Sequence, residues 1–329
     1  MHCTSKFAAL LIAFVALHAP SAPAAAQGVF TIVEGELVVL RETRQFVALE
    51  GMRVRAEDIV RNGSGTRLAR IEFDDGTLVD LGPDTELLLQ PHALTGERAA
   101  ALYLLRGWLK VTTPAAGIAL ATPRLDLRKL AGSAVLRATP QAALVFVEAG
   151  RAELTERLDG QAGAGHTVRE GDAFAARAAT PGATLRRPPA DLVDGLPRGF
   201  VDPLPRRAAA WKGREVEPVA GTPVAYADAS AWLHAESALR PGFVQRFTPM
   251  ARDKRFRAGL VAELKTHPEW DRVLFPEKYR PKPPAAPASA PVLARGRNVE
   301  LPVAVPRAWL EALEPRLSRT PTQVPVEVH

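Results

Sequence analysis

The sequence has very little cysteine and few aromatic residues. Its single cysteine, Cys3, precedes the first apolar run, whereas a lipid-anchor cysteine would follow such a run. The rest of the chain therefore offers no thiol nucleophile, no disulfide and no cysteine metal site. Aromatics make up 6% of the residues, so the core must consist mainly of valine, leucine, alanine and isoleucine. Since 47% of the residues are hydrophobic, the chain can still bury a substantial core.

Catalytic and metal-binding patterns are also missing. The histidines beyond residue 26 stand alone, without an H-x-H or H-E-x-x-H pair that would predict a zinc site: they are His92, His166, His234, His267 and His329. We expect His267 to cap a helix because Pro268 follows it, and His166 to be exposed in a glycine-rich turn. Ser64 lacks a triad pattern around it, and Gly63–Gly65 is too short for a phosphate loop.

The strongest site-like cluster is acidic. The segment FDDGTLVDLGPD contains four aspartates, Asp74, Asp75, Asp80 and Asp84. Their spacing does not match a calcium loop, and no glutamate stands where a bidentate ligand is needed. Asp-Gly and Pro-Asp are common turn dipeptides, so we interpret the cluster as structural turns. The sequence therefore predicts no catalytic, cofactor-binding or metal-binding residues, no cofactor, and a protein that is not an enzyme.

The N-terminus has the pattern of a secretory signal. Lys6 is followed by an apolar run from Phe7 to Leu17 and then by SAPAAAQ, in which Ala24 and Ala26 fit the small-residue cleavage positions. We predict a signal peptide at residues 1–26 and a periplasmic or secreted protein. The alternative is an uncleaved anchor, but the run is shorter than the roughly 20 residues that span a bilayer. No second apolar span occurs downstream.

Residues 28–180 contain many short apolar runs separated by glycine or proline. GVFTIV and ELVVLR flank Glu34-Gly35, which predicts a hairpin. RLARIEF alternates with a period of two, and Asp75-Gly76 then predicts a tight turn into TLVDL. The later runs read as separate short strands: TELLLQ, AALYLLRGWLKVTT, GIALAT, LDLRKL, SAVLRA, ALVFVEAG, RAELTER and HTVREGDAF. The pattern predicts a mainly β domain, as a sandwich, barrel or β-solenoid.

The second half of the chain is richer in proline and carries helical signals. Asp228 or Ser230 can cap a helix that Pro241-Gly242 would end. Asp253 can cap another, with Phe256, Leu260, Val261 and Leu264 on one face, and Pro268 suits the first turn of a third. Beyond the β domain at 27–180, we predict a proline-rich wrapping or linking segment at 181–226, short helices at 227–280, a proline-rich linker at 281–305, and a terminal helix or tail at 306–329.

The terminal segment has its own expectation. Trp309, Leu310, Leu313 and Leu317 can form an apolar stripe on a short helix, although Pro315 weakens that helix. The linker before it has too little apolar bulk to fold. We expect residues 281–329 to be detached from the core and readily cut by protease; docking on the β domain is the alternative.

Charge differs between the two halves. Residues 27–180 carry 18 basic and 20 acidic side chains, whereas residues 181–329 carry 23 basic and 16 acidic ones. The basic half is the better candidate for an acidic partner. Export makes nucleic acid an improbable partner, so an envelope protein is expected, with an anionic cell-wall polymer as the alternative. A plain, soluble mixed surface also accounts for this charge.

The order of strands and turns carries a family pattern. GVFTIVEGELVVLR looks like an opening hairpin, GMRVRAEDIV like the turn before the central strands, and RLARIEFDDGTLVDLGPDTELLL is the closest match. ATPRLDLRKLAGSAVLRA, VFVEAGRAEL and VREGDAF follow in the same order. Residues 28–180 thus resemble the FecR domain, the periplasmic part of iron-uptake regulators, which also occurs in stand-alone exported bacterial proteins.

Two positions depart from this pattern. Glu57 stands where the family usually has glycine before Asp58, and Ala131-Gly132-Ser133 replaces an Arg-Gly-Thr triplet. The resemblance implies a β-rich domain with a role in signal transfer or surface organisation, and it brings no catalytic residues. We expect a non-catalytic binding or adaptor protein of the bacterial envelope. The alternatives are a cell-wall or glycan-binding module and an undetected hydrolase.

Overall fold

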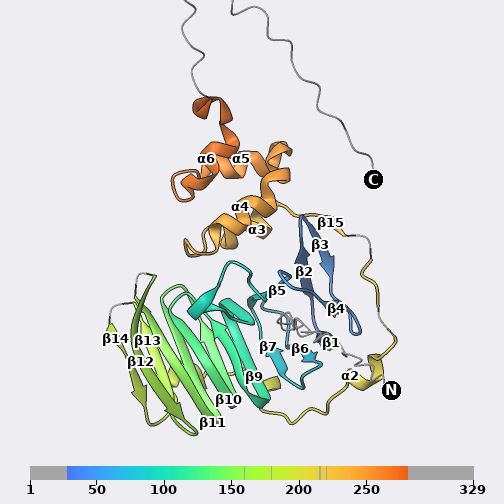
Figure 1. The fold of residues 1–329 in the computed structure, drawn as a ribbon. Helices are drawn as coiled ribbons and strands as arrows, with labels where there is room; N and C mark the ends of the chain where they lie inside the picture. The colour runs from blue at the N-terminus through green and yellow to red at the C-terminus, as the bar shows by residue number, and fades with distance from the viewer. Residues whose placement is uncertain (1–27, 159, 179, 215, 220, 281–329) are drawn as a thin grey trace, which may run out of the picture. The chain divides into compact units, whose positions relative to one another are not determined.

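The computed structural model describes residues 28–280 except 159, 179, 215 and 220, with backbone only at 115–117. The fifteen strands in this part of the chain are hydrogen-bonded into one sheet (Figure 1). The longer helices follow the strands, from residue 226 onward. The prediction of a mainly β protein with a smaller helical C-terminal region is therefore confirmed.

The sheet divides into two layers at β9 (Leu102–Ala121). Residues 109–112 of β9 pair with β7, and residues 102–106 pair with β8. Layer one continues from β7 (Leu78–Leu81) through β6 (Leu68–Phe73), β1 (Gly28–Glu34) and β4 (Arg53–Val54). Layer two continues from β8 (Glu86–Leu89) through β5 (Ile59–Asn62), β2 (Leu37–Arg41), β3 (Arg44–Val47) and β15 (Thr222–Pro223).

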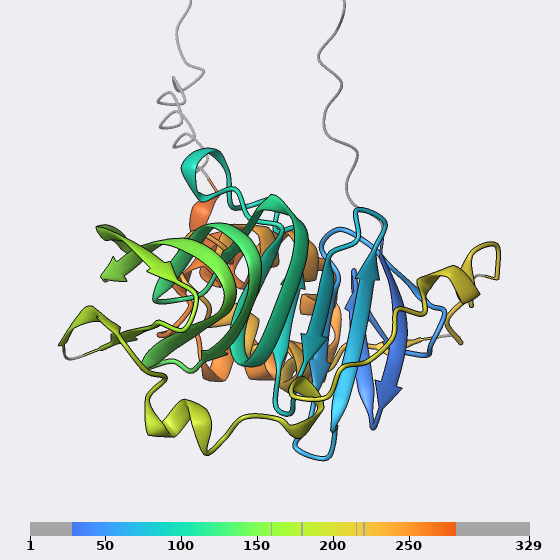
Figure 2. The same ribbon diagram turned by 90° about the horizontal axis from the view of Figure 1, so that it is seen from below.

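Three long strands pass through both layers: β9, β10 (Leu125–Ala138) and β11 (Ala142–Leu158), which curve strongly in Figure 2. Gly132 and Gly150 face each other where β10 and β11 cross between the layers, with φ of +117° and +80°. A Cβ on either would lie about 2 Å from a backbone oxygen, so both bends require glycine. The prediction of shorter, separate strands here is wrong: LDLRKL and SAVLRA, for example, both lie in β10.

Beyond β11 the two layers end separately. Residues 142–146 pair with β13 (Ala173–Arg177), which pairs in turn with β14 (Thr180–Leu185) in layer one. Residues 151–158 pair with β12 (Gln161–Arg169) in layer two.

The strands of layer two are buried on both faces. Val39, Val60 and Leu87 belong to the main core together with layer-one residues such as Ile71. Their neighbours Leu40, Ile59 and Leu88 point the other way and pack against the helices. Because side chains alternate between the faces of a strand, each of these strands supplies two cores at once.

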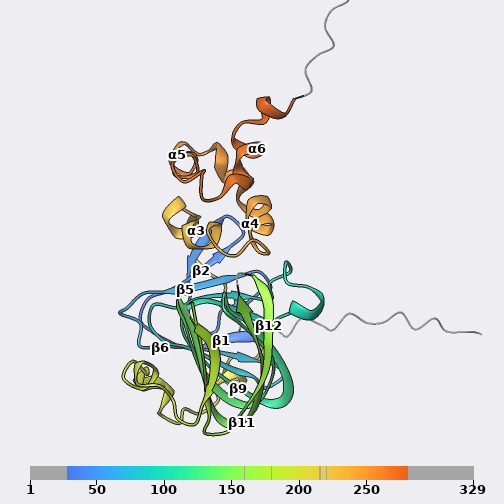
Figure 3. The same cartoon turned by 90° about the vertical axis from the view of Figure 1, so that its left-hand side faces the viewer.

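The helical region covers the outer face of layer two (Figure 3). Its largest fully buried side chains are Trp232, Phe247, Phe256 and Trp270. Its elements are α3 (Tyr226–Leu233), α4 (Arg240–Phe247), η3 (Thr248–Arg252), α5 (Lys254–Ala262), η4 (Pro268–Trp270), α6 (Asp271–Leu274) and η5 (Pro276–Tyr279).

The segment between the sheet and these helices packs on the outer face of layer one. Leu192 and Phe200 join Ile32 and Leu68 in a third apolar cluster. The Glu72 carboxylate accepts hydrogen bonds from the backbone amides of Arg207 and Ala208. This segment contains α1 (Ala190–Val193), η2 (Arg198–Phe200) and α2 (Ala208–Trp211); η1 (Gly96–Arg98) lies earlier, between β8 and β9.

The two predicted hairpins have different outcomes. The turn at Asp75-Gly76 is confirmed, because β6 and β7 pair across it. The hairpin at Glu34-Gly35 is wrong: β1 pairs with β6 and β4, and β2 pairs with β3 and β5. Gly35, with φ of +122°, instead lets the chain pass from layer one to layer two.

Helix boundaries were partly predicted. Asp253 is the N-cap of α5, and its carboxylate accepts hydrogen bonds from the backbone amides of Arg255 and Phe256. That predicted cap is therefore confirmed. Pro241-Gly242 does not end a helix; it lies in the first turn of α4, where proline loses no helical hydrogen bond. Val261 is 45% exposed and leaves the buried face expected for it. The predicted signal peptide and the segments from 281 onward lie outside the described residues.

Candidate functional site

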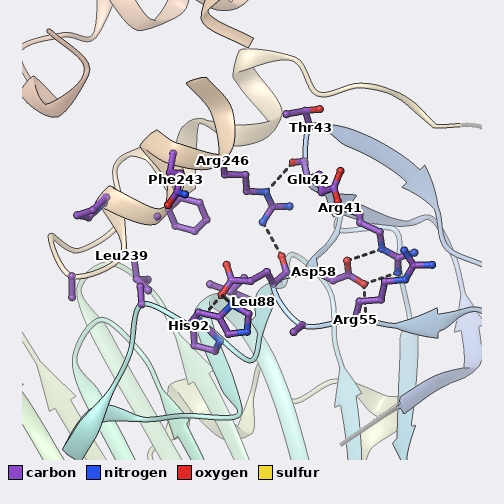
Figure 4. Close-up of a pocket in the computed structure, with 18 of the residues that line it drawn as sticks. Arg41, Glu42, Thr43, Arg55, Asp58, Leu88, His92, Leu239, Phe243 and Arg246 are labelled. Atoms are coloured by element: carbon purple, nitrogen blue, oxygen red, sulfur yellow. Dashed lines mark hydrogen bonds and ion pairs between the residues drawn. The ribbon is translucent and has the colours of Figure 1, made fainter. Parts of the chain in front are cut away.

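A groove of about 940 Å³ lies between α4 and the loops at the edge of layer two (Figure 4). Residues between 238 and 249 form its helical wall. The opposite wall consists of the β2–β3 turn at 41–43, the β4–β5 loop at 55–58 and the residues after β8 at 91–93. The groove therefore exists only because the helical region is packed against the β domain.

Arg246 fixes the two walls to each other. Its guanidinium donates hydrogen bonds to the carbonyl oxygens of Leu40 (2.7 Å), Glu42 (2.8 Å) and Glu57 (2.7 Å). Burial lowers the pKa of Arg246 because it removes the cation from water, and the nearby carboxylate charges of Glu57, Asp58 and Glu42 only partly oppose this effect. Both contacted loops contain residues in the left-handed region, Glu42 at φ of +54° and Glu57 at +63°. The cation thus helps to hold these two backbone segments in their strained conformations.

A buried ion pair orders the β4–β5 loop. The Asp58 carboxylate, 1% exposed, receives two hydrogen bonds from Arg41, at 2.7 and 2.9 Å. It also accepts the backbone N–H of Arg55 at 2.8 Å. Glu57 precedes it in a conformation that favours glycine, which explains why the FecR pattern usually has glycine there. Its carboxylate accepts the backbone N–H of His92 and so joins this loop to the chain after β8.

The groove presents mixed chemistry to solvent. Arg55, Glu42 and His92 are exposed on the β wall, and Pro241 and Gln245 are exposed on the helical wall. The Asp58 carboxylate is already bonded to Arg41, and the Arg246 guanidinium to three carbonyls. An open groove that carries both charge signs and an exposed proline suits an extended polypeptide better than a single small ion.

A second charged cluster joins the helical region to the β domain. Arg98, in η1, bonds to Glu236 at 2.8 Å and to Asp126 of β10 at 3.0 Å. Burial alone would lower the pKa of Arg98, but the hydrogen bonds to these two carboxylates outweigh it and raise the pKa. Burial, together with the Glu236 charge, also raises the pKa of the nearby Tyr103 hydroxyl. We call this cluster the Arg98 clamp.

The aspartates of the acidic segment have separate structural roles. The Asp75 carboxylate accepts the Thr77 N–H at 2.8 Å, as expected for a turn. Asp74 and Asp84 are exposed, and Asp84 is in a left-handed conformation. Asp80 differs from expectation: it makes a buried ion pair with Arg70 across β6 and β7, at 2.6 Å. The four side chains therefore do not converge on one site.

The histidines also lie apart from one another, except for one pair. His92 is at the groove, and the rings of His234 and His267 lie 5.1 Å apart in the helical region. His166 is not in an exposed turn; it is half-buried in β12 against Phe174. His267 occupies the N-cap position of η4, as expected, although its side chain makes no capping hydrogen bond. The residue is fully buried, and burial lowers its pKa.

Two sequence observations remain to be placed. Ser64 lies in an exposed loop, and His329 is outside the described residues. Among the residues that the structure describes, no group of three or more histidine, cysteine, aspartate or glutamate side chains could hold a metal ion.

Sequence reasoning missed the residues that build the groove. Arg246 contacts backbone 189 to 206 residues earlier in the chain, and no local pattern marks such a contact. The departure from glycine at Glu57 was a usable signal, because it marked a positive-φ position beside a buried aspartate.

The comparison with protein families gives one match. Residues 58–153 match the family model described as FecR protein, so the chain carries a FecR-family domain. The matched segment runs from the start of β5 into β11, and it confirms the resemblance inferred from the turns and strands. It supports a signalling or regulatory protein. No curated protein matches this sequence.

Solved structures give a weaker likeness. Two crystal structures, at 2.50 and 1.65 Å resolution, are of a protein proposed to be an anti-sigma factor from Parabacteroides distasonis ATCC 8503. Each is 15% identical with a TM-score of 0.33, and the match covers 41% of this chain and 62% of that chain. In the part of this chain that the structure describes, no helix is both long and apolar enough to cross a membrane.

Proposed function

We propose that this protein is an exported, non-catalytic adaptor of the bacterial envelope, and that it binds an extended segment of a partner protein in the groove between α4 and layer two. The observation that carries the proposal is the groove itself, which is built jointly by the FecR-family β domain and the helical region. Arg246 and the Arg41–Asp58 pair hold its walls in place before any partner arrives. Preformed walls reduce the entropy that binding must overcome.

The groove supports a catalytic function less well than a binding function. The Asp58 carboxylate is neutralised by Arg41, and the Glu57 carboxylate is bonded to the His92 amide. The Glu57 carboxylate also lies 3.7 Å from Nδ1 of the His92 ring, but no hydrogen bond among the described residues joins that ring to a hydroxyl, as the activation of a nucleophile would require. The acidic and basic groups here instead form ion pairs and hydrogen bonds that order the backbone of the walls.

A glycan-binding module is the second candidate. Sugar sites usually stack their ligands on exposed aromatic rings, which present a flat apolar face with a polar edge. Among the described residues, the large exposed hydrophobic side chains include one aromatic, Tyr279, and it lies in η5 rather than in the β domain. Only the basic charge after residue 180 favours an anionic polymer.

The test compares two alanine-to-tryptophan variants. Ala238 lines the groove, so Ala238→Trp should fill it. Ala258 is exposed on α5 and does not line the groove, so Ala258→Trp is the matched control. Immobilised protein lacking residues 1–26 is incubated with envelope extract, and captured proteins are quantified by mass spectrometry.

The proposal predicts that wild type and Ala258→Trp capture the same envelope protein and that Ala238→Trp captures at least about tenfold less, the equivalent of about 1.4 kcal/mol of binding free energy. Equal capture by both variants would place the partner elsewhere. Binding of all three to purified cell-wall sacculi, without protein capture, would favour the polymer instead.

A further inference from the structure

The helix α5 has an exposed face that carries cations and no acidic residue. Residues three, four and seven positions apart lie on the same side of a helix, so these side chains form one surface opposite the buried Phe256 and Leu260. The exposed residues of this surface, which we call the α5 face, are Lys254, Arg255, Ala258, Val261 and Ala262, with Lys265 in the turn that follows.

The acidic residues at the two ends of α5 do not neutralise this face. Asp253 is the N-cap, and its carboxylate accepts hydrogen bonds from the backbone amides of Arg255 and Phe256. Glu263 is the C-cap and stands three residues after the buried Leu260, which turns it away from the α5 face. Within the part of the chain that the structure describes, the three cations of the α5 face make no ion pair. Their charges are therefore available to an anionic partner.

The margin of the α5 face toward η5 adds further cations and an exposed aromatic ring. The guanidinium of Arg257, on the flank of α5, lies 5.7 Å from the centre of the Phe275 ring, and the Lys278 ammonium lies 4.2 Å from the same ring. The next residue, Tyr279, is 49% exposed. Tyrosine is enriched where proteins meet the water–lipid boundary, because its ring is apolar and its hydroxyl is polar. Two acidic residues offset part of the charge at this margin: Asp271 and Glu277.

We propose that the α5 face binds the surface of a membrane that contains anionic lipids. Lys254, Arg255 and Lys265 contact the lipid phosphates, and Val261, which is 45% exposed, enters the boundary between head groups and acyl chains. Long basic side chains can reach the phosphates while the apolar centre of the face stays in contact with lipid. The inference does not depend on the groove or its partner.

The shape of the α5 face favours a lipid surface over an acidic protein. Tight protein interfaces bury anchor side chains in pockets. The central residues of the α5 face, Ala258, Val261 and Ala262, project from a convex helix, and none of them lines the groove described above. A membrane surface is fluid, so it adapts to a convex helix, and it presents many negative charges at once.

Charge reversal on the α5 face tests the electrostatic part of the proposal. The double variant Lys254→Glu, Arg255→Glu changes the first turn of α5, where acidic residues stabilise a helix, so it should stay folded. The matched control, Arg187→Glu with Arg198→Glu, changes the net charge equally at two exposed residues of the segment that packs on layer one. Protein lacking residues 1–26 is sedimented with vesicles of phosphatidylcholine that contain either no phosphatidylglycerol or about 40%, in about 0.1 M salt. Circular dichroism checks that each variant is folded.

A second pair of variants tests the apolar centre of the face. Val261→Leu adds one methylene at an exposed position and should bind anionic vesicles about threefold more tightly than wild type. Val261→Ser removes the apolar side chain and should bind them at least about threefold more weakly. The same binding by both variants would mean that position 261 does not enter the lipid, and it would contradict the proposed orientation.

Each basic side chain close to an anionic membrane strengthens binding by a factor of about five. Wild type should therefore bind anionic vesicles at least about tenfold more tightly than neutral ones, and Lys254→Glu, Arg255→Glu should lose at least about tenfold. The control should stay within about twofold of wild type. Equal binding of wild type to both kinds of vesicle, or an equal loss in the control, overturns the proposal. So does binding of the α5 face to soluble polyglutamate without binding to vesicles, which would assign the face to an acidic polypeptide.

Discussion

Loss of the Arg98 clamp should destabilise the fold far more than loss of a neighbouring surface ion pair. Arg98, Asp126 and Glu236 have side chains that are 16%, 5% and 15% exposed. Removing one partner of a buried pair leaves an uncompensated charge, at a cost of about 3–5 kcal/mol. The lower end applies here, because Arg157 stays 3.7 Å from Asp126. We therefore expect Arg98→Met to lower the free energy of unfolding by about 3 kcal/mol.

The assay is urea denaturation followed by circular dichroism and tryptophan fluorescence. The nearby Arg128–Glu97 pair is the control: Glu97 is 92% exposed, so Arg128→Met should cost less than about 0.5 kcal/mol. A double-mutant cycle with Glu236→Gln should show coupling above about 1 kcal/mol. If Arg98→Met costs less than about 1 kcal/mol, or shows no coupling to Glu236, the clamp does not hold the helical region on the β domain.

Four further predictions concern three single positions and the start of the exported chain. Glu57→Gly should be about 1 kcal/mol more stable than Glu57→Ala in urea denaturation, because both lose the bond to the His92 amide and only glycine avoids the left-handed strain. Gly150→Ala should cost more than about 3 kcal/mol or prevent folding, since its Cβ would overlap a backbone oxygen; a loss below about 1 kcal/mol would contradict the proposed bend. Burial lowers the folded-state pKa of His267 below its unfolded value of about 6.5, so the unfolded state binds more protons and stability should fall as the pH drops below that value. His267→Gln should remove this part of the pH dependence, and His92→Gln, at an exposed site, should not. Intact mass measurement of exported protein should show a chain that starts near Gln27; an intact Met1 would contradict export.

The sequence predicted the features that depend on neighbouring residues. The period of two in RLARIEF and the Asp75-Gly76 turn specify the β6–β7 hairpin, and Asp253 specifies the start of α5. Both are local effects of side-chain direction and of hydrogen bonding to free amides. The mainly β class followed from repeating such local patterns.

Strand pairing and the groove could not be predicted in this way. β1 and β2 look like a hairpin, but Gly35 turns the chain between layers, and β1 finds its partner β6 some 40 residues later. The sequence pattern predicted several short strands in place of β10 and β11, because Gly132 and Gly150 are typical of turns. In the structure, each of these glycines bends a continuous strand. Arg246 gives no sequence signal, since its partners are carbonyl oxygens of distant backbone.

The most direct test of the central claim is crosslinking from inside the groove in living cells. Gln245 is exposed and lines the groove, so a photoreactive amino acid placed there would contact any bound segment. The same substitution at Ala258, outside the groove, is the control. The account predicts a light-dependent adduct with one envelope protein from position 245 and none from position 258. Adducts from both positions alike, or from neither, would contradict a partner-binding role for the groove.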